Sequence, residues 1–149
     1  MQPLNFPSYP FRFKNSENKT AIFDEIRKKF ILLTPEEWVR QHMIQFLLVE
    51  KKYPKSLINV EKVLFVNGLR KRYDIVVYNS DGSICILVEC KAPQITISQA
   101  TFDQIAQYNM TLNSQFLMVT NGLNHYFCKI DAVKEQYHFL PEIPNYTIL

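Results

Sequence analysis

Cysteine is scarce in this chain, with three residues among 149. Cys85, Cys90 and Cys128 are too few and too scattered for a disulfide framework or a zinc site. Two of them lie within an apolar strand pattern, which is typical of small buried side chains in a reducing compartment. We therefore expect a protein without disulfides.

Long apolar runs are also missing. No stretch approaches the roughly 18 apolar residues of a membrane-spanning helix, and the first residues lack the charged and apolar regions of a signal peptide. Repeats, low-complexity tracts and blocks of like charge are absent, and the charged fraction of 21% is ordinary. These absences predict a soluble, cytoplasmic, globular chain with no membrane partner.

The length of the chain favours one domain. We expect it to cover residues 1–149, with an irregular arm at about 1–20 and a tail at about 141–149, because prolines recur in both.

The strongest pattern is a predicted hairpin. Two β-branched, apolar runs flank Asp81-Gly82, a pair that suits a two-residue type I′ turn. Paired residues would then have numbers that sum to 163, so Asp74 would lie opposite Glu89, and Lys91 would share their face. Opposed carboxylates have Cβ atoms about 5 Å apart and repel by about 3 kcal/mol at an effective dielectric of about 20. The pair therefore needs a compensating cation, for which a divalent metal is the natural candidate.

A second hairpin signal, Asn67-Gly68, precedes the first. Partners across this turn would have numbers that sum to 135, so that Glu61 would face Asp74. A three-stranded meander would thus gather acids and bases on one face of the sheet: Glu61, Asp74, Glu89, Arg70, Arg72 and Lys91.

Two helices are predicted around this meander. Thr34 can cap a helix that runs to about Glu50, with Pro35 in its first turn. Glu37 then shares a helix face with Arg40 and Gln41, and it is either a capping-box acid or a contributor to the site.

The second helix begins at Ser98 and runs to about Leu112. Gln104 and Tyr108 fall four residues apart on one of its faces, where either could be a plain surface residue.

The remaining segments carry weaker patterns. Residues 21–33 favour a short hairpin, residues 116–119 a buried strand, and residues 125–130 a further strand. The three histidines show no metal-ligand spacing and are interpreted as ordinary partly buried residues: His42, His125 and His138.

Positive charge is concentrated although the net charge is only +3. Residues 51–72 contain seven basic residues and one acid. Such a stretch is either a solvated face or a surface for phosphates, and its densest part is Arg70, Lys71 and Arg72.

The order of these elements, with Asp74 on one strand and Glu89-Cys90-Lys91 on the next, resembles the PD-(D/E)xK nuclease superfamily. Tyr73 stands where the superfamily's name places proline, which leaves the metal-binding acid in place. The Gln-x-x-x-Tyr spacing of the second helix makes the chain similar to the nuclease domain at the N-terminus of type I restriction enzyme R subunits, over about residues 20–145.

The resemblance implies an α/β (α+β) fold: a restriction-endonuclease-like three-layer core in which helices flank a mixed central sheet with an antiparallel meander. It also implies Mg²⁺-dependent cleavage of DNA phosphodiesters in restriction-modification, with Mn²⁺ able to replace Mg²⁺.

The resemblance assigns roles to individual residues. Asp74 and Glu89 would bind the metal, and Glu37, Glu36 or Glu61 would complete an outer ligand sphere. Lys91 would orient or deprotonate the attacking water. Gln104 and Tyr108 would place the backbone or brace Lys91, while Arg70, Lys71 and Arg72 would contact flanking phosphates.

Two other interpretations stay open at this stage. One is a non-catalytic module with the same fold that docks nucleic acid or a restriction-complex partner, and the other is a structural domain with a buried charge network. The chain has no Gly-x-x-x-x-Gly-Lys-Ser/Thr pattern, so ATP-dependent restriction by this chain alone is not implied. A separate motor or restriction-complex subunit is therefore an expected partner beside DNA.

Overall fold

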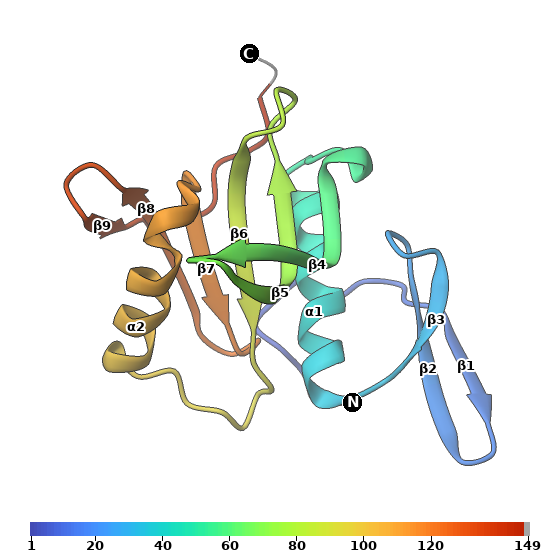
Figure 1. The fold of residues 1–149 in the computed structure, drawn as a ribbon. Coiled ribbons are helices and arrows are strands. Elements are labelled where there is room, and N and C mark those ends of the chain that lie inside the picture. Colours follow the sequence, from blue (N-terminus) through green and yellow to red (C-terminus); the bar gives the residue numbers. More distant parts are fainter. Residues whose placement is uncertain (148–149) are drawn as a thin grey trace.

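A six-stranded mixed sheet forms the centre of the protein (Figure 1). The structure is a computed structural model, and it describes residues 1–147. The strands follow one another in chain order, and only the β6–β7 pair is parallel. Their bounds are β4 (Ile58–Val66), β5 (Leu69–Tyr78), β6 (Ile84–Cys90), β7 (Phe116–Thr120), β8 (His125–Asp131) and β9 (Gln136–Phe139).

One helix covers each face of this sheet. Helix α1 (Pro35–Gln45) continues into a π-helical turn at Phe46–Glu50, and α2 (Gln99–Asn109) into a 3₁₀ turn at Met110–Leu112. Alternate residues of β6 supply the two cores: Val88 packs in the cluster of α1, and Leu87 in the cluster of α2. Each fully buried side chain of this size contributes roughly 1.5–3 kcal/mol. The predicted three-layer α/β core is thus confirmed.

Both predicted helix starts are confirmed by their caps. The Thr34 hydroxyl accepts a hydrogen bond from the backbone N of Glu37 at 3.0 Å, and the Ser98 hydroxyl accepts one from the backbone N of Thr101 at 3.1 Å. These bonds satisfy amide groups that have no partner inside the helix.

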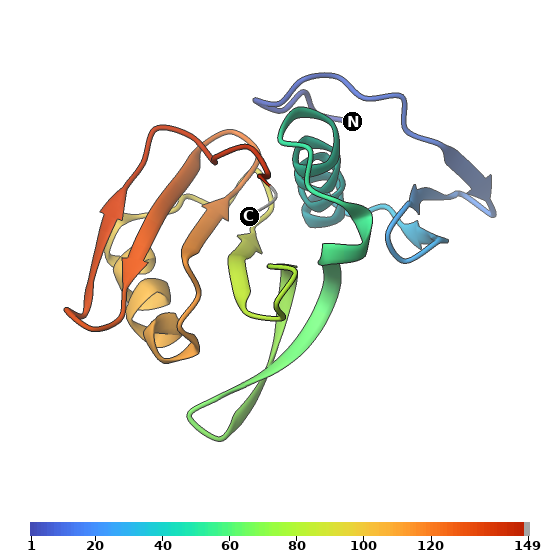
Figure 2. The same cartoon turned by 90° about the horizontal axis from the view of Figure 1, so that it is seen from above.

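A separate three-stranded antiparallel sheet stands beside α1 (Figures 1 and 2). It consists of β1 (Phe13–Ser16), β2 (Lys19–Asp24) and β3 (Lys29–Leu32). The hairpin expected within residues 21–33 is therefore present, but regular structure begins at Phe13, inside the expected irregular arm. The turn before β2 uses Glu17 and Asn18, both with positive φ, and this pair is not one of the strong turn signals.

The first twelve residues contain no strand or helix but are held by the core. The backbone N of Asn5 donates to Gly122 O at 2.7 Å, and the Trp38 indole donates to Gln2 O at 2.7 Å. Gly122 has a φ of +86°, and a Cβ on it would lie 2.8 Å from the side chain of Leu4. A side chain at this position would therefore force the arm away from the sheet.

The tail is pinned in a similar way. Ile143 is buried, and the backbone N of Tyr146 donates to Lys51 O at 2.8 Å. Residues 148 and 149 of the expected tail lie outside the described residues.

The strand register around the site is the predicted one. Partners on β4 and β5 have numbers that sum to 135, and partners from Ile75 to Val77 on β5 sum to 163 with β6. The predicted two-residue turn at Asp81-Gly82 is wrong, because the loop is one residue longer and closes between Asn79 and Ser83. A register shift beside Val77 compensates for the extra residue.

The cysteines and the helices bear on a disulfide-bonded and on a membrane-spanning arrangement. All three cysteines are free and buried. Within residues 1–147, no helix is long and apolar enough to cross a membrane.

Candidate active site

The Asp74 carboxylate lies against the end of β6. Pairing between β5 and β6 is recorded as far as Ile75 and Val88, and beyond it Asp74 Oδ2 accepts a hydrogen bond from the backbone N of Cys90 at 2.8 Å. The aspartate of one strand thus contacts the backbone between Glu89 and Lys91 of the next. The two sequence patterns therefore meet where the two strands separate.

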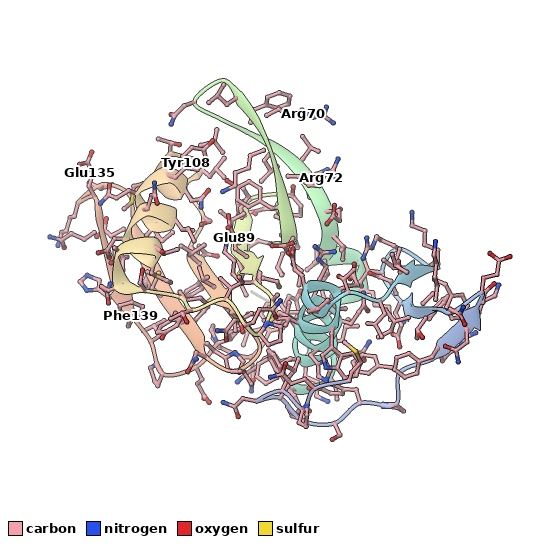
Figure 3. The ribbon with its side chains drawn as sticks, turned by 90° about the horizontal axis from the view of Figure 1, so that it is seen from below. Arg70, Arg72, Glu89, Tyr108, Glu135 and Phe139 are labelled. Carbon is pink, nitrogen blue, oxygen red and sulfur yellow. The ribbon has the colours of Figure 1, made fainter. Side chains whose placement is uncertain are left out.

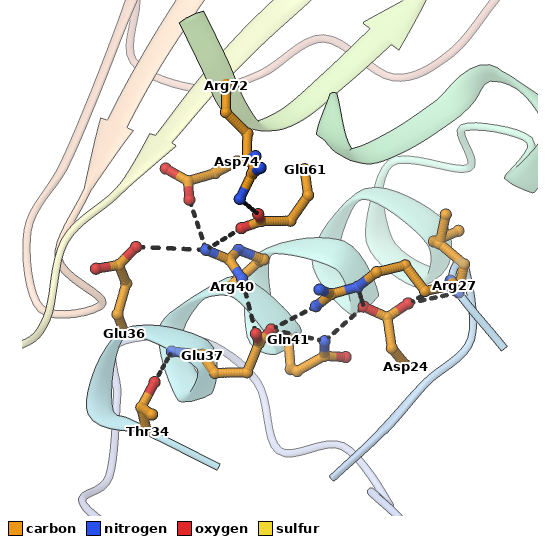
Figure 4. Close-up of polar contacts among 11 residues, drawn as sticks. Asp24, Arg27, Thr34, Glu36, Glu37, Arg40, Gln41, Glu61, Arg72 and Asp74 are labelled. Carbon is orange, nitrogen blue, oxygen red and sulfur yellow. Dashed lines mark hydrogen bonds and ion pairs between the residues drawn. The ribbon is translucent and has the colours of Figure 1, made fainter. Parts of the chain in front are cut away.

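A buried arginine on α1 binds this aspartate and three further acids (Figure 4). Arg40 Nη2 lies 2.7 Å from Asp74 Oδ1, 2.9 Å from Glu61 Oε1 and 3.3 Å from Glu36 Oε1, and Nη1 lies 2.7 Å from Glu37 Oε1. Burial opposes the charge of Arg40, but the carboxylates of Asp74 and Glu37 outweigh it and raise its pKa. The compensating cation that the sequence required is therefore supplied, around Asp74, by the protein itself.

Sequence reasoning gave Arg40 no role in the site. The available signal was its spacing three residues after Glu37 on one helix face, which allows an ion pair between them. Its contact with Asp74 joins residues 34 positions apart, and only the tertiary fold reveals it.

Glu37, expected as a metal ligand, lies on the far side of Arg40 from Asp74. Its other oxygen accepts hydrogen bonds from Arg27 and Gln41, both at 3.0 Å (Figure 4). Arg27 and Gln41 also bind Asp24, the last residue of β2, at 2.8 Å each. Burial opposes the charge of Asp24, but these bonds and the Arg27 backbone lower its pKa. Glu37 therefore joins the small sheet to α1 and holds Arg40 in place.

Glu89 has a different cation. Lys71 Nζ lies 2.7 Å from Glu89 Oε1, and it also stands 4.9 Å from the ring centre of Tyr73 and 4.7 Å from that of Tyr108 on α2. Cation–π contacts of this kind add to the ion pair. Lys71, expected to contact DNA, is thus engaged at Glu89.

The helix motif lies beside the same lysine. A shallow pocket of about 330 Å³ is lined by Lys71, Gln104, Ile105 and Tyr108. The two motif residues were expected to place the DNA backbone or to brace Lys91. The contact that the structure gives to Tyr108 is with Lys71, whose Nζ lies 4.7 Å from its ring centre.

Asp74 and Glu89, the two acids expected to bind a metal, face different layers, contrary to the expectation of one shared face. Asp74 binds Arg40 of α1, whereas Glu89 binds a lysine that contacts α2. The cause is a break in side-chain alternation, since Tyr73 packs with α2 and Ile75 with α1 although they are two residues apart. Glu61, opposite this break, has a left-handed φ of 58°, and the pairing of β4 with β5 skips Glu61 and Asp74.

Lys91 directly follows β6 and is partly buried. Its backbone N donates to Thr120 O at 2.8 Å, which fixes its position beside β7. Burial and the charge of Asp74 raise the pKa of Glu36, whereas the charges of Arg40 and Lys91 oppose that rise. Lys91 and Arg40 thus act on the same carboxylate, that of Glu36.

The carboxylates of Asp74 and Glu89 carry the hard oxygen atoms that Mg²⁺ prefers. No group of three or more acids, histidines or cysteines among residues 1–147 is close enough to hold a metal. Mg²⁺, however, usually keeps several waters and is bound by one or two carboxylates together with substrate phosphates. Asp74 and Glu89 supply hard oxygen atoms, and each carboxylate can accept more bonds than its present partners provide. Arg40 and Lys71 are the cations with which a metal would compete.

Comparison with known proteins places the chain in a family. A family model described as the N terminus of type I restriction enzyme R proteins matches residues 35–144. The chain belongs to this family. All candidate site residues lie within the match, whereas β1, β2 and β3 lie before it.

A solved structure supports the fold of this R-protein domain. It is a fragment of a protein assigned as an HsdR subunit of a type I restriction enzyme from Vibrio vulnificus YJ016. The two chains are 21% identical with a TM-score of 0.51, and the match covers 76% of this chain and 24% of the other. The chain therefore spans about a quarter of the length of that structure. No curated protein matches it.

Proposed function

We propose that this R-protein N-terminal domain is a PD-(D/E)xK-type nuclease that hydrolyses DNA phosphodiesters with Mg²⁺, for which Mn²⁺ can substitute. The observation that carries the proposal is the contact of Asp74 with the backbone between Glu89 and Lys91. It joins an acid on one strand to a Glu-x-Lys segment on the next, in the family of type I restriction enzyme R protein N termini.

Asp74 and Glu89 would hold the metal together, which requires the Glu89 carboxylate to turn from the α2 side toward Asp74. Glu61 or Glu36 would add to an outer ligand sphere. When bound, Mg²⁺ polarises the scissile phosphate and lowers the pKa of its water. Glu37 would act on this site through Arg40, which it holds at 2.7 Å.

The remaining residues would act by charge and position. Lys91 would orient the attacking water or take its proton, and its ammonium would stabilise charge that develops on the phosphate. Tyr108 would keep Lys71 at Glu89, and Gln104 would contact the DNA backbone from the rim of the same pocket. Arg70 and Arg72 would hold flanking phosphates without reading bases.

A specific observation favours a second function, that of a non-catalytic module that docks DNA or another subunit of a restriction complex. Asp74 and Glu89 are each already neutralised by a protein cation, at 2.7 Å in both cases. In a domain that never binds a metal, Asp74 and Glu89 would keep these ion pairs at all times, because a carboxylate that loses its partner inside the protein is costly.

Metal titration separates the two functions. Mg²⁺ or Mn²⁺ at millimolar concentration should raise the melting temperature, because binding to the folded state stabilises it. Asp74→Asn should remove this rise, whereas Glu135→Gln in the exposed turn before β9 should keep it. No rise in the wild type with either ion favours the docking module.

Cleavage assays then test Lys91. With Mn²⁺ and duplex, flapped and single-stranded DNA, Lys91→Ala should abolish cleavage while DNA binding stays within about tenfold, or roughly 1.4 kcal/mol. Lys91→Arg should fail as well, because a guanidinium does not release its proton. If the wild type binds every DNA form but cleaves none, and Lys91→Ala binds equally well, the catalytic proposal is wrong.

A further inference from the structure

The β4–β5 hairpin exposes large apolar side chains at its tip. Phe65 is 67% exposed and Leu69 is 63% exposed, on either side of the Asn67-Gly68 turn. Val66, between Phe65 and the turn, is buried at 1% exposure in the core below α2. The base of the tip is therefore anchored, and the exposed phenyl ring projects from a fixed backbone.

Arginines share the face of the hairpin that carries this ring. Phe65 pairs directly with Arg70, and Val63 with Arg72. Figure 2 shows the hairpin extending from the sheet, and Figure 3 shows Arg70 and Arg72 along it. An aromatic ring thus stands beside two guanidinium groups on one ribbon face.

This face leads to the candidate active site. Arg72 binds Glu61 at 3.3 Å, and the same carboxylate binds Arg40, the partner of Asp74. At about 3.4 Å per residue, Arg70 stands about 14 Å along β5 from Asp74. A DNA strand that reaches Asp74 could therefore extend to the hairpin tip within a few nucleotides.

We propose that Phe65 stacks on an unpaired or unstacked DNA base, while Arg70 and Arg72 hold the adjacent phosphates. The charge of the hairpin favours this occupant, since it carries four basic residues (Lys62, Arg70, Lys71 and Arg72) against two acids, Glu61 and Asp74, and both acids are paired with arginines. Proteins that bind single-stranded nucleic acid combine exposed aromatic rings with nearby positive charge, as this hairpin face does. Apolar side chains can also insert between unstacked bases.

This inference rests on the proposed function only in taking DNA as the partner, and it names the form of DNA that the site prefers. It requires neither a metal nor cleavage. Bases are available for stacking in single strands, flaps and mismatched steps, whereas a continuous duplex keeps its bases covered.

Binding without metal provides the test. In EDTA, fluorescence anisotropy should show that Phe65→Ala weakens binding to single-stranded and flapped DNA by about 5- to 150-fold, which is the range for one stacked base. Binding to fully paired duplex should change less. Phe13→Ala, at a residue that is 48% exposed in the small sheet, is the matched control and should bind as the wild type.

A substitution that retains the ring gives a second measurement. Phe65→Trp should keep the affinity, and its indole fluorescence should be quenched by single-stranded DNA. Arg70→Ala should weaken binding to every DNA form equally. Because Phe65 is mostly exposed, these variants should melt at the temperature of the wild type.

Three outcomes would overturn the proposal. They are an unchanged affinity of Phe65→Ala for single strands and flaps, an equal loss on paired and unpaired DNA, and no DNA binding by the wild type. In each case, stabilisation by Mg²⁺ that depends on Asp74 would still support the proposed metal site. The two proposals can therefore be contradicted independently.

Discussion

Arg40 stands between α1 and the sheet and binds four carboxylates, with a side chain that is 8% exposed. Ion pairs at this depth gain little net stability over apolar packing, because both partners lose their hydration. Removing one partner is different, since the other then remains as an uncompensated charge. The acids around Arg40 therefore depend on it more than Arg40 depends on any one of them.

Replacing Arg40 with Met should consequently cost roughly 3–5 kcal/mol of unfolding free energy. Asp74→Asn should cost much less, because Glu36, Glu37 and Glu61 continue to neutralise the arginine. Urea denaturation without metal measures both values. A cost below about 1 kcal/mol for Arg40→Met would mean that the acids are protonated or hydrated in its absence.

Lys71 gives a test of the competition between protein cation and metal. Lys71→Met releases Glu89 from its ion pair, so Mg²⁺ should bind about fivefold more tightly, the equivalent of about 1 kcal/mol for a partly exposed pair. Lys62→Met is the matched control, since it removes the same charge from β4, and it should change affinity less. Calorimetric titration provides the readout. Weaker Mg²⁺ binding by Lys71→Met would instead show that Lys71 positions Glu89 for the metal.

Helix α1 carries contacts in several directions. Glu37 binds the turn after β2 through Arg27, while the opposite side of the helix holds the N-terminal arm through the rings around His42. His42 lies 4.4 Å from the ring of Trp38 and 4.8 Å from that of Phe11, measured between ring centres. One helix thus links the arm, the small sheet and the candidate site.

The arm should make stability dependent on pH. Burial lowers the pKa of His42, against its bond to Trp38 O, and burial also lowers the pKa of His125, whose Nε2 lies 2.7 Å from Asn5 O. A depressed pKa means that the folded state binds fewer protons. The stabilisation is therefore complete above about pH 6.5, the unfolded value, and is lost as the pH falls below it.

Melting temperatures between pH 7.5 and pH 5 test this dependence. His42→Phe should flatten the profile in part, because His125 still titrates, and the exposed His138→Gln should not alter it. A wild-type melting temperature that does not fall over this range would contradict the prediction.

The elements differ in how far the sequence predicts them. The register of β4, β5 and β6 follows from Asn67-Gly68 and from alternation, and it survives an incorrect turn at Asp81 because a register shift restores the count. Strands β1 and β9 escaped prediction. Each adjoins a turn formed by residues such as Asn18 and Glu135, whose positive φ no glycine signals.

The candidate site is less accessible to sequence reasoning than the sheet. The identities of Asp74, Glu89 and Lys91 follow from strand spacing, but their partners Arg40 and Lys71 do not. Both contacts depend on the break in alternation between Tyr73 and Ile75, which moves one acid toward each helix. No local sequence pattern predicts this break in side-chain alternation, because it arises where β5 and β6 separate between two packed layers.

Charge over the whole molecule is weakly positive, at +3, so the salt dependence of DNA binding should come from few residues. Among the described residues, Arg72 pairs with Glu61 and Lys71 with Glu89, whereas Arg70 is exposed and has no recorded carboxylate partner. Arg70→Ala should therefore flatten the slope of log affinity against log salt by about 0.9 on duplex DNA. Arg72→Ala should flatten the slope by less, because Arg72 is already partly neutralised by Glu61. Both losses should be similar for unrelated DNA sequences, since phosphate contacts carry no base information. Equal slopes for the wild type and Arg70→Ala would remove the hairpin from the DNA interface.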